Sequence, residues 1–504
     1  MTPTSTDTAF FGHPRGLSTL FFTEMWERFS YYGLRAILIL FMTAAVTEGG
    51  LGWDVGKAGA VYGIYVALVY MLSLPGGWVA DKLLGLRKSV LYGGVLIMLG
   101  QLSLAVPGTT LFFPGLGLII LGTGLLKPNV SVIVGELYSA EDVRRDAGFS
   151  IFYMGINLGA FISPLVVGGL AQSPGFREIL AGWGMDPASA WHWGFGIGAL
   201  GMFLGLVQYR LGWKHLGDAG MRPSVDPASA AGAAARKMMW IGGGSIVAII
   251  GVVATLIMGG TVSLLGFTNA FSWVYLAVVV GFFAALFGAG TWTAEERKRL
   301  IVILVLFVGA AIFWAAFEQA PSTLNLFARD NTRNSIFGMT FPSSWFQSVN
   351  ALFIIIFAPV FAWLWVRMGA RDPSSPAKFT VGLLFAGLGF LVMVGAANAS
   401  ANGVLVSPMW LVLTYFLHTV GELCLSPVGL SSMTKLAPDR VKGMIMGVWF
   451  LAASMGNLIA GQITRLYADF TVPQIFGAVT AFCLVSAVVM FLLVGPIRRM
   501  MEAK

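Results

Sequence analysis

The chain has 504 residues, of which 57% are hydrophobic and 11% are charged, whereas roughly a quarter of the residues of a soluble protein are charged. This composition excludes an ordinary soluble globular domain. The net charge of +8 would suit a nucleic-acid binder only if the basic residues gathered on one face, but they are spread between hydrophobic segments, so we expect no nucleic-acid partner. Cys424 and Cys483 lie in apolar runs without metal-ligand or CxxC spacing, and they indicate no disulfide, metal or cofactor site.

Fourteen apolar segments follow one another along the chain, most near or above the roughly 20 residues that an α-helix needs to cross a bilayer. They form groups of six, two and six. The predicted segments are 17–46, 58–80, 90–106, 111–134, 149–170, 191–209, then 238–258 and 271–289, and then 300–320, 345–366, 379–394, 408–432, 444–463 and 475–494. We therefore predict an all-α polytopic membrane protein with two six-helix bundles and two extra helices between them.

The charged breaks between the segments predict the division of the chain and its orientation. We expect both termini in the cytoplasm, because most Lys and Arg lie in the loops on the terminal side of the membrane. The predicted parts are a cytoplasmic N-terminus at 1–16, an N-terminal bundle at 17–209, a cytoplasmic linker at 210–237, a two-helix insertion at 238–298, a C-terminal bundle at 299–496 and a cytoplasmic tail at 497–504.

The loop after the second segment contains a spaced set of glycines and charges. Its residues Gly77, Asp81, Lys82, Gly85, Arg87 and Lys88 resemble the G-x-x-x-D-[RK]-x-x-G-x-[RK]-[RK] motif of the major facilitator superfamily. The glycines permit a tight turn, and the cations mark the inner membrane surface. The resemblance implies two bundles with a substrate site between them near the middle of the bilayer.

Seven ionisable side chains lie inside the predicted spans, where each charge costs roughly 2.5 to 3.5 kcal/mol at the bilayer centre. We expect them to pair and to face a water-filled cavity. They are Glu24, Glu27, Arg28, Arg35, Lys127, Glu318 and Glu422. Four acids against three bases leave one ionisable carboxyl in excess.

The first segment carries a polar stripe. At roughly 100° per residue, one helix face collects Glu24, Arg28, Tyr31, Tyr32 and Arg35, with Glu27 beside Tyr31. Snorkelling toward the cytoplasmic interface is possible for residues 24–28, but it explains Arg35 poorly, because apolar sequence continues on both sides of Arg35. The stripe is therefore expected to line a cavity.

The other embedded charges have opposite signs in the two halves of the chain. Lys127 lies beside a proline in the N-terminal half, whereas Glu318 and Glu422 are acids of the C-terminal half, one turn from Trp314 and Ser426 respectively. A cavity with a cationic and an anionic wall is complementary to a zwitterion. Amphipathic walls would come from Tyr31, Tyr32, Tyr70, Trp314 and Trp449, although Tyr70 and Trp449 taken singly are also typical packing residues.

Four motifs along the chain resemble those of the proton-dependent oligopeptide transporter (POT) family. They are ExxERFxYYG from Glu24 to Gly33, FYxxINxG from Phe152, FWxxxEQ from Phe313, and GELxxSP from Gly421 to Pro427. Ala160 and Ala320 depart from the family pattern, where Ser and Gly are frequent. Both departures exchange one small residue for another, so they leave the charged residues untouched.

The resemblance implies a symporter that imports di- and tripeptides together with protons, in the inner membrane of a bacterium, as a functional monomer without a cofactor. It implies that Arg28, Arg35 and Lys127 bind the peptide carboxylate and that Glu422 receives the peptide amino group. Asn157 and Asn350 would bind the peptide backbone, and the side chains around it would be Tyr31, Tyr32, Tyr70, Trp314, Ser426 and Trp449. Glu24, Glu27 and Arg28 would couple protons. Pairs such as Arg35 with Glu318 or Lys127 with Glu422 would open and close the two faces.

Three alternatives stay open at the level of the sequence. A carrier of nitrate or another small anion would need the cations without an amine-binding acid, and the presence of both Lys127 and Glu422 favours peptides. An enzyme or channel would need a catalytic motif or a selectivity filter, and neither pattern occurs. The two middle helices could bind a partner instead of tethering the bundles. His418, one turn from Glu422, is either a hydrogen-bonded packing residue or a residue that tunes that acid.

Overall fold

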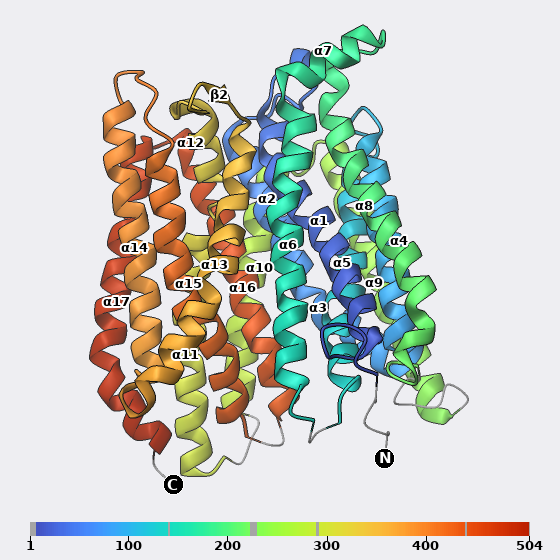
Figure 1. Ribbon diagram of the computed structural model, residues 1–504, viewed down its shortest axis with the longest axis vertical. Coiled ribbons are helices and arrows are strands. Elements are labelled where there is room, and N and C mark those ends of the chain that lie inside the picture. Colours follow the sequence, from blue (N-terminus) through green and yellow to red (C-terminus); the bar gives the residue numbers. More distant parts are fainter. Residues whose placement is uncertain (1–6, 140–141, 222–228, 289–291, 439–440, 503–504) are drawn as a thin grey trace. The chain divides into compact units, whose positions relative to one another are not determined.

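The computed structural model describes residues 7–139, 142–221, 229–288, 292–438 and 441–502, and within these ranges the chain is almost entirely α-helical (Figure 1). Eleven helical spans in the described residues are long and apolar enough to cross a membrane. The structure thus confirms an all-α polytopic membrane protein, while the count of fourteen spans stays a prediction. Parts of the predicted terminus (1–6), linker (222–228), insertion (289–291) and tail (503–504) lie outside the described residues.

Every predicted segment contains a long helix. Their bounds are α1 Arg15–Thr43, α2 Val55–Met71, α3 Ser73–Val79, α4 Leu86–Ala105, α5 Phe112–Glu136, α6 Arg145–Gln172, α8 Ala190–Gly212, α9 Ala230–Met258, α10 Leu264–Gly288, α11 Ala294–Phe317, α13 Gln347–Met368, α14 Ser375–Ser400, α15 Met409–Leu436, α16 Lys442–Arg465 and α17 Val472–Glu502. Short helical turns lie at Val46–Glu48, Ala80–Leu84, Pro187–Ser189, Trp213–Leu216, Ser343–Phe346, Gly369–Arg371 and Leu466–Ala468.

Several elements were not predicted from the sequence. These are the short helices α7 (Pro174–Gly182) and α12 (Thr323–Asn331), and an antiparallel pair of two-residue strands, β1 (Ser335–Ile336) and β2 (Met339–Thr340). In addition, α9 begins inside the predicted linker, after Ser229, whose hydroxyl accepts a hydrogen bond from the backbone N–H of Gly232. A run of alanines follows this cap, and alanine has the highest helix propensity.

The helices pack as two compact units that differ from the division by chain order. Unit 1 comprises Met1–Ile37, Thr47–Gly49 and Met71–Phe267, and unit 2 comprises Leu38–Val46, Gly50–Tyr70 and Thr268–Lys504. The last turns of α1 and nearly all of α2 therefore pack with the C-terminal helices. The predicted bundle borders at 209 and 299 stay predictions.

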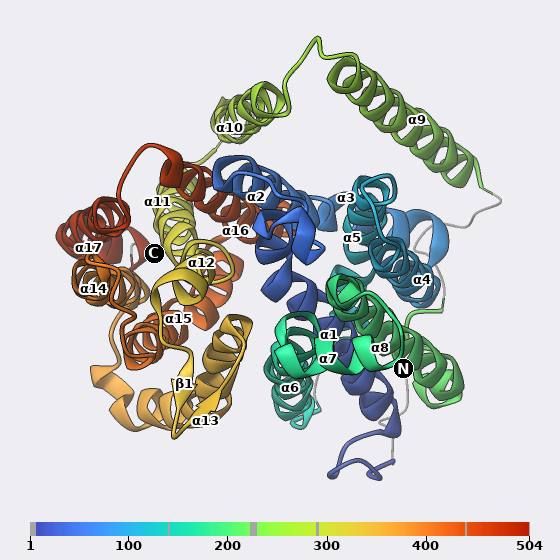
Figure 2. The same cartoon turned by 90° about the horizontal axis from the view of Figure 1, so that it is seen from above.

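Close backbone contacts organise unit 1. Helix α4 lies between α5 and α8, and α6 packs against α8 (Figure 2). A Cβ atom on Gly122 of α5 would lie 2.5 Å from the carbonyl oxygen of Gly93 in α4, and one on Gly100 would lie 2.7 Å from the carbonyl oxygen of Gly115. Only glycine permits this approach, which is a frequent device where two membrane helices cross.

In unit 2, α14 packs against both α15 and α17, and α11 packs against α16 (Figure 2). Helix α2 also lies on α16, through glycines of both helices. A Cβ on Gly63 would lie 2.8 Å from the Cα of Gly461, and a Cβ on Gly59 would lie 2.7 Å from the side chain of Thr464. The Ser454 hydroxyl of α16 donates to the Ala67 carbonyl at 2.7 Å, so the two helices are joined by packing and by a hydrogen bond.

The predicted span 58–80 lies within the candidate membrane span Val55–Leu84, in which the structure has a break between two helices. Helix α2 ends at Met71 and α3 begins at Ser73. Pro75 causes the break, because its ring nitrogen has no hydrogen to donate to the carbonyl four residues earlier and its ring displaces that carbonyl. Beyond the break α3 joins unit 1, where a Cβ on Gly76 would lie 2.0 Å from the Gly124 carbonyl oxygen of α5.

The loop that resembles the major facilitator motif makes the expected tight turn, since Gly85 has a φ of +77°. Arg87, however, is buried and is not an exposed surface cation. Its guanidinium donates to the carbonyl oxygens of Gly217, at 2.6 Å, and Ala219. Glu136 accepts a hydrogen bond from the Gly220 backbone at 2.6 Å. Arg87 and Glu136 together fasten the start of the linker to unit 1.

The segment before α1 is held by a small polar cluster. The Nδ1 atom of His13 lies 2.9 Å from the Tyr138 hydroxyl, and Arg144 donates to the Gly12 carbonyl at 3.3 Å. Burial and the nearby Arg144 charge hold the pKa of His13 below its usual 6.5. Hydrogen bonds from Arg144 hold the pKa of Asp142 at about 2, so this carboxylate stays ionised.

The contact of α2 with α16 predicts the effect of Gly63→Ala. The added methyl group would meet the Gly461 backbone, and overpacking of this kind costs about 1 to 3 kcal/mol. We expect a lower thermal transition temperature for the detergent-purified variant. Gly281→Ala in α10 is the control, because a Cβ there meets nothing within 4 Å. Equal transition temperatures for the two variants would contradict the close contact.

The His13 cluster predicts a pH-dependent attachment of the N-terminal segment. When the segment detaches, the pKa of His13 returns to about 6.5, so the detached form binds more protons and is favoured as the pH falls below 6.5. Hydrogen exchange around His13, corrected for the intrinsic rate, should be faster at one pH unit below 6.5 than at one unit above. His13→Gln should remove this difference, and a difference that persists would assign it to another group.

Candidate functional site

The centre of α1 carries a buried cluster of two acids and one base, Glu24, Glu27 and Arg28, each at most 3% exposed. The Nε atom of Arg28 lies 3.2 Å from Oε1 of Glu24, one helical turn away, and it also contacts Oε2 of Glu27 directly. A buried charge is tolerated only when it is paired. The three residues therefore form one electrostatic unit, as their clustering in the sequence predicted.

This cluster is not fully hydrogen-bonded. Oε2 of Glu24, Oε1 of Glu27 and Nη2 of Arg28 are buried and have no hydrogen-bond partner among the described residues. Buried polar atoms are nearly always satisfied in folded proteins, so each exception requires an explanation. Two carboxylate oxygens can accept a proton, and a guanidinium nitrogen can donate to an anion. The cluster thus retains the capacity to bind both.

Two tyrosines join Arg28 to Arg35 along the same face of α1. The Arg28 guanidinium carbon lies 4.9 Å from the ring centre of Tyr31, and that of Arg35 lies 5.4 Å from the same ring and 5.5 Å from that of Tyr32. The tyrosine rings meet edge to face at 5.3 Å. The predicted polar stripe is therefore a continuous stack of aromatic rings and cations.

Helices α6 and α4 fix the position of this stripe. A Cβ on Gly159 of α6 would lie 2.3 Å from the Met25 carbonyl and 3.0 Å from the Arg28 Cβ, so α6 approaches α1 beside the cluster. From the opposite side, Gln101 of α4 donates to the carbonyl and hydroxyl oxygens of Ser30, at 3.1 and 3.0 Å. Sequence reasoning missed Gln101, although an uncharged polar residue inside an apolar span could have indicated it.

Two further predicted residues of unit 1 have different surroundings. Lys127 of α5 is half-buried and lies near enough to Glu24 to act on it electrostatically. Asn157 of α6 is buried, and its amide donates to the carbonyl of Tyr153 in its own helix at 3.0 Å. The structure thus brings Lys127 to the acidic cluster, while the amide of Asn157 already has a backbone partner.

In unit 2, the predicted residues Asn350 and Glu422 lie together. The Asn350 amide of α13 donates to Oε2 of Glu422 in α15 at 3.1 Å and to the Thr419 hydroxyl at 2.9 Å. Glu318, at the end of α11, lies near enough to Glu422 to repel its negative charge. Two acids of unit 2 therefore share one neighbourhood, and an amide donor orients one of them. Thr419 was not predicted as part of this group.

Glu318 stands where α11 ends. The chain turns and continues as α12, and Gln319 stabilises this turn: its side-chain oxygen accepts from the Thr323 hydroxyl at 2.9 Å. On the preceding turn Trp314 packs against α16, because a Cβ on Gly456 would lie 2.5 Å from the Trp314 Cβ. The carboxylate and the indole are thereby carried on a helix end with a fixed geometry.

The remaining predicted residues of unit 2 surround α15. The Trp449 ring packs on the backbone of Gly429, where a Cβ would lie 2.3 Å from the ring. Ser426 is half-buried one turn beyond Glu422, and Tyr70 is half-buried at the end of α2. His418 is buried against Phe390, with ring centres 5.2 Å apart, and these surroundings favour the packing alternative. No cluster of His, Cys, Asp and Glu in the described ranges could hold a metal ion.

The cluster on α1 predicts a strong effect of Arg28→Met on stability. The substitution would leave two buried carboxylates with only the nearby Lys127 as a counter-charge, at a cost of about 3 to 5 kcal/mol. We expect a large drop in the thermal transition temperature at neutral pH. The double variant Glu27→Gln and Arg28→Met should recover most of the loss, because Glu24 and the nearby Lys127 then balance each other. An unchanged transition temperature for Arg28→Met alone would show that the glutamates do not depend on it.

Comparison with families of known proteins gives a match to the POT family over residues 87–481. A peptide transporter of Yersinia enterocolitica, YePEPT, is 45% identical, and the alignment covers 99% of this chain and 98% of the relative. A di-/tripeptide transporter of Lactococcus lactis is 38% identical over 98% of both chains.

Solved structures agree with these matches. A crystal structure of a peptide transporter POT in complex with sulfate has a TM-score of 0.88 and 46% identity, covering 98% of this chain and 96% of that one. A POT family transporter in complex with a thioalcohol-conjugated peptide has a TM-score of 0.87 and 36% identity, covering 97% of this chain and 98% of that one.

Proposed function

Since this chain belongs to the POT family, we propose that it imports di- and tripeptides together with protons. At the coarser level, the chain is a peptide transporter of the membrane with the major facilitator fold, and it is not an enzyme. The observation that supports the proton-coupled mechanism is the buried cluster of Glu24, Glu27 and Arg28. In this cluster one oxygen of each glutamate and one guanidinium nitrogen have no hydrogen-bond partner among the described residues.

Charge balance supports coupling. Glu24 and Glu27 contribute two negative charges, and Arg28 and the nearby Lys127 contribute two positive charges, so the group is neutral when all four residues are ionised. A peptide carboxylate that binds Arg28 leaves one glutamate without its counter-charge in a buried site. A proton restores neutrality at much lower cost than an unpaired buried charge. Peptide and proton binding then favour each other.

We place the two ends of the peptide at groups of opposite charge. The carboxylate binds Arg28, Arg35 and Lys127, and the amino group binds Glu422, which the Asn350 amide orients. Tyr31, Tyr32, Tyr70, Asn157, Trp314, Glu318, Ser426 and Trp449 form the rest of the proposed site. The proximity of Glu318 to Glu422 supports an amine at this point, because a cation between two acids relieves their repulsion.

The proposal includes the setting of the protein in the cell. The chain acts as a monomer in the bacterial inner membrane, with both termini in the cytoplasm, because the loops on the terminal side carry most of the basic residues. Alternating access exposes the peptide site first to one side of the membrane and then to the other. Protons are the coupling ion, and no cofactor takes part.

Uptake into proteoliposomes tests the proposal. A labelled dipeptide should accumulate when the outside is more acidic than the inside, and it should only equilibrate when no gradient is imposed. Glu27→Gln should abolish the accumulation and leave exchange of labelled for unlabelled peptide, because the site remains but its titratable carboxyl is lost. Glu178→Gln, at an exposed position of α7, is the control and should behave as the native protein.

Competition experiments on the same proteoliposomes define the substrate. Unlabelled di- and tripeptides should displace the labelled dipeptide, while free amino acids and nitrate should not. Displacement by nitrate would overturn the peptide assignment in favour of an anion carrier. Accumulation that survives in Glu27→Gln would move proton coupling away from this residue.

A further inference from the structure

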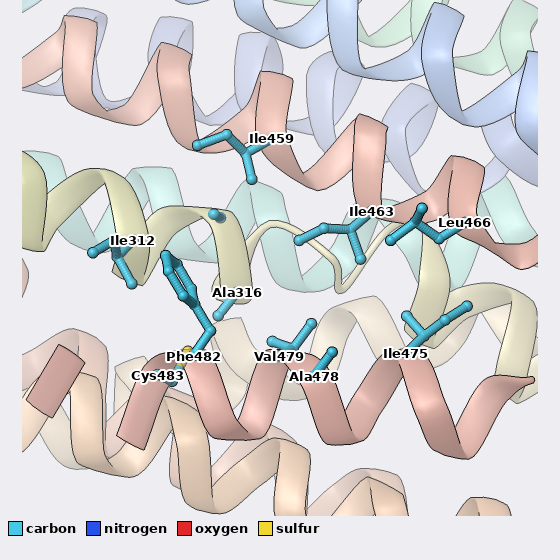
Figure 3. Close-up of a pocket in the computed structure, with 11 residues that line it drawn as sticks. Ile312, Ala316, Ile459, Ile463, Leu466, Ile475, Ala478, Val479, Phe482 and Cys483 are labelled. Carbon is cyan, nitrogen blue, oxygen red and sulfur yellow. The ribbon is translucent and has the colours of Figure 1, made fainter. Parts of the chain in front are cut away.

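An apolar groove of about 220 Å³ lies within unit 2, and no charged residue of the proposed site lines it (Figure 3). Side chains of α16 and α17 form its two walls, and α11 forms its floor. All eleven lining residues are aliphatic, Phe or Cys, so the groove presents almost no polar group. It therefore cannot bind a peptide, whose backbone would lose its hydrogen bonds to water without any replacement.

The packing of the three helices explains the groove. Helix α11 packs along both α16 and α17, whereas α16 and α17 make few contacts with each other. Where they separate, α11 carries the small residues Ala315 and Ala316, which are buried and leave space above the floor. Ile463 of α16 and Val479 of α17 stand at the two sides of this space (Figure 3).

The groove opens toward the surroundings of the protein. Phe482 at its rim is 55% exposed, and Leu466, near the turn that joins α16 to α17, is 37% exposed. Its floor and one wall belong to the membrane spans Ala294–Phe317 and Val472–Met500. Because these spans are long and apolar enough to cross a membrane, we infer that the opening of the groove faces lipid.

We propose that this groove binds one acyl chain of a membrane phospholipid, inserted between α16 and α17. Water is a poor occupant, because a buried water needs two to four polar partners, and a dry apolar cavity of roughly 150 Å³ is already large enough to bind benzene. If the groove were empty, the side chains of its walls would lose the dispersion contacts that an occupant provides. The bilayer supplies acyl chains directly to the opening, and a flexible chain fits a narrow slot between two helices.

The bound chain supports the helix that carries part of the proposed site. Ala315 and Ala316 directly follow Trp314, and α11 ends at Phe317, just before Glu318. An acyl chain that fills the groove keeps α17 and α16 at their distances from α11 and stabilises this end of the helix from behind. The inference does not depend on the identity of the transported substrate.

Photocrosslinking tests the proposal on the full-length protein in nanodiscs. The probe is a phosphatidylethanolamine with a diazirine in its acyl chain, and labelled peptides are identified by mass spectrometry after proteolysis. Ala478→Trp should fill the groove, because Ala478 lines it. Val485→Trp is the matched control: it lies two turns further on nearly the same face of α17, is 62% exposed and does not line the groove.

We expect crosslinks on lining residues of α11, α16 and α17 in the native protein and in Val485→Trp, and a several-fold loss in Ala478→Trp. Equal labelling of Ala478→Trp and Val485→Trp would overturn the proposal. Crosslinks confined to residues that do not line the groove, or crosslinked dimers at this groove, would do so as well, because the occupant would then be bulk lipid or a second copy of the chain.

If Ala478→Trp folds poorly, its crosslinking cannot be compared with that of the native protein. The effect of added phospholipid on the thermal transition temperature is then the second test. A ligand that binds the folded state raises its transition temperature. Added phospholipid should therefore raise the transition temperature of the detergent-purified native protein and of Val485→Trp. The rise should be much smaller for Ala478→Trp and for Ile463→Phe, which fills the groove from the α16 side. Equal rises in all four proteins would contradict a chain bound at this position.

Discussion

The ion pairing of Arg28 with Glu24 and Glu27 is the interaction on which the rest of the molecule depends. Three ionisable groups within five residues of a membrane helix are expensive unless they neutralise one another. Their pairing lets α1 be buried among apolar helices, and Gly159 lets α6 approach it closely. The same pairing makes the cluster responsive, because an anion that binds Arg28 disturbs a balance that only a proton or another cation can restore.

Close glycine contacts within each unit and a break between two helices define the two units. Glycine contacts hold α4 to α5 in unit 1 and α2 to α16 in unit 2, where side chains larger than hydrogen would force the backbones apart. Between them, Pro75 interrupts the helix from α2 to α3 where the chain passes from one unit to the other. A break at this point lets neighbouring turns of one membrane span belong to different packed units. In proteins whose domains move as rigid bodies, the ends of helices are typical hinge positions.

The helical segments and the charged cluster within one helix could be predicted from the periodicity and the motifs of the sequence. The helical segments follow from apolar run lengths, and the cluster on α1 follows from a spacing of four residues, because neighbours on one helix do not depend on the rest of the fold. The break at Pro75 was missed, since the apolar run continues through it. The short helix α12 was missed because it extends beyond an apolar run that ends near Ala320.

Contacts between helices could not be predicted in the same way. The hydrogen bond from Asn350 to Glu422 joins positions far apart in the chain, and the amide of Asn157 turned to its own helix rather than outward. Helix α2 belongs to unit 2 because its glycines pack against α16, and the periodicity of a sequence does not specify which two helices pack together. The family resemblance supplied a set of side chains as a prediction, whereas the contacts of these side chains required the structure.

The central claim is that peptide binding and proton uptake are linked through the cluster on α1. Its most direct test adds peptide to the purified protein in weakly buffered solution near neutral pH and follows the proton concentration with an indicator dye. The account predicts that protons disappear from solution as peptide binds, and that this uptake is lost in Glu27→Gln while peptide still binds. Peptide binding by the native protein without any proton uptake would contradict it.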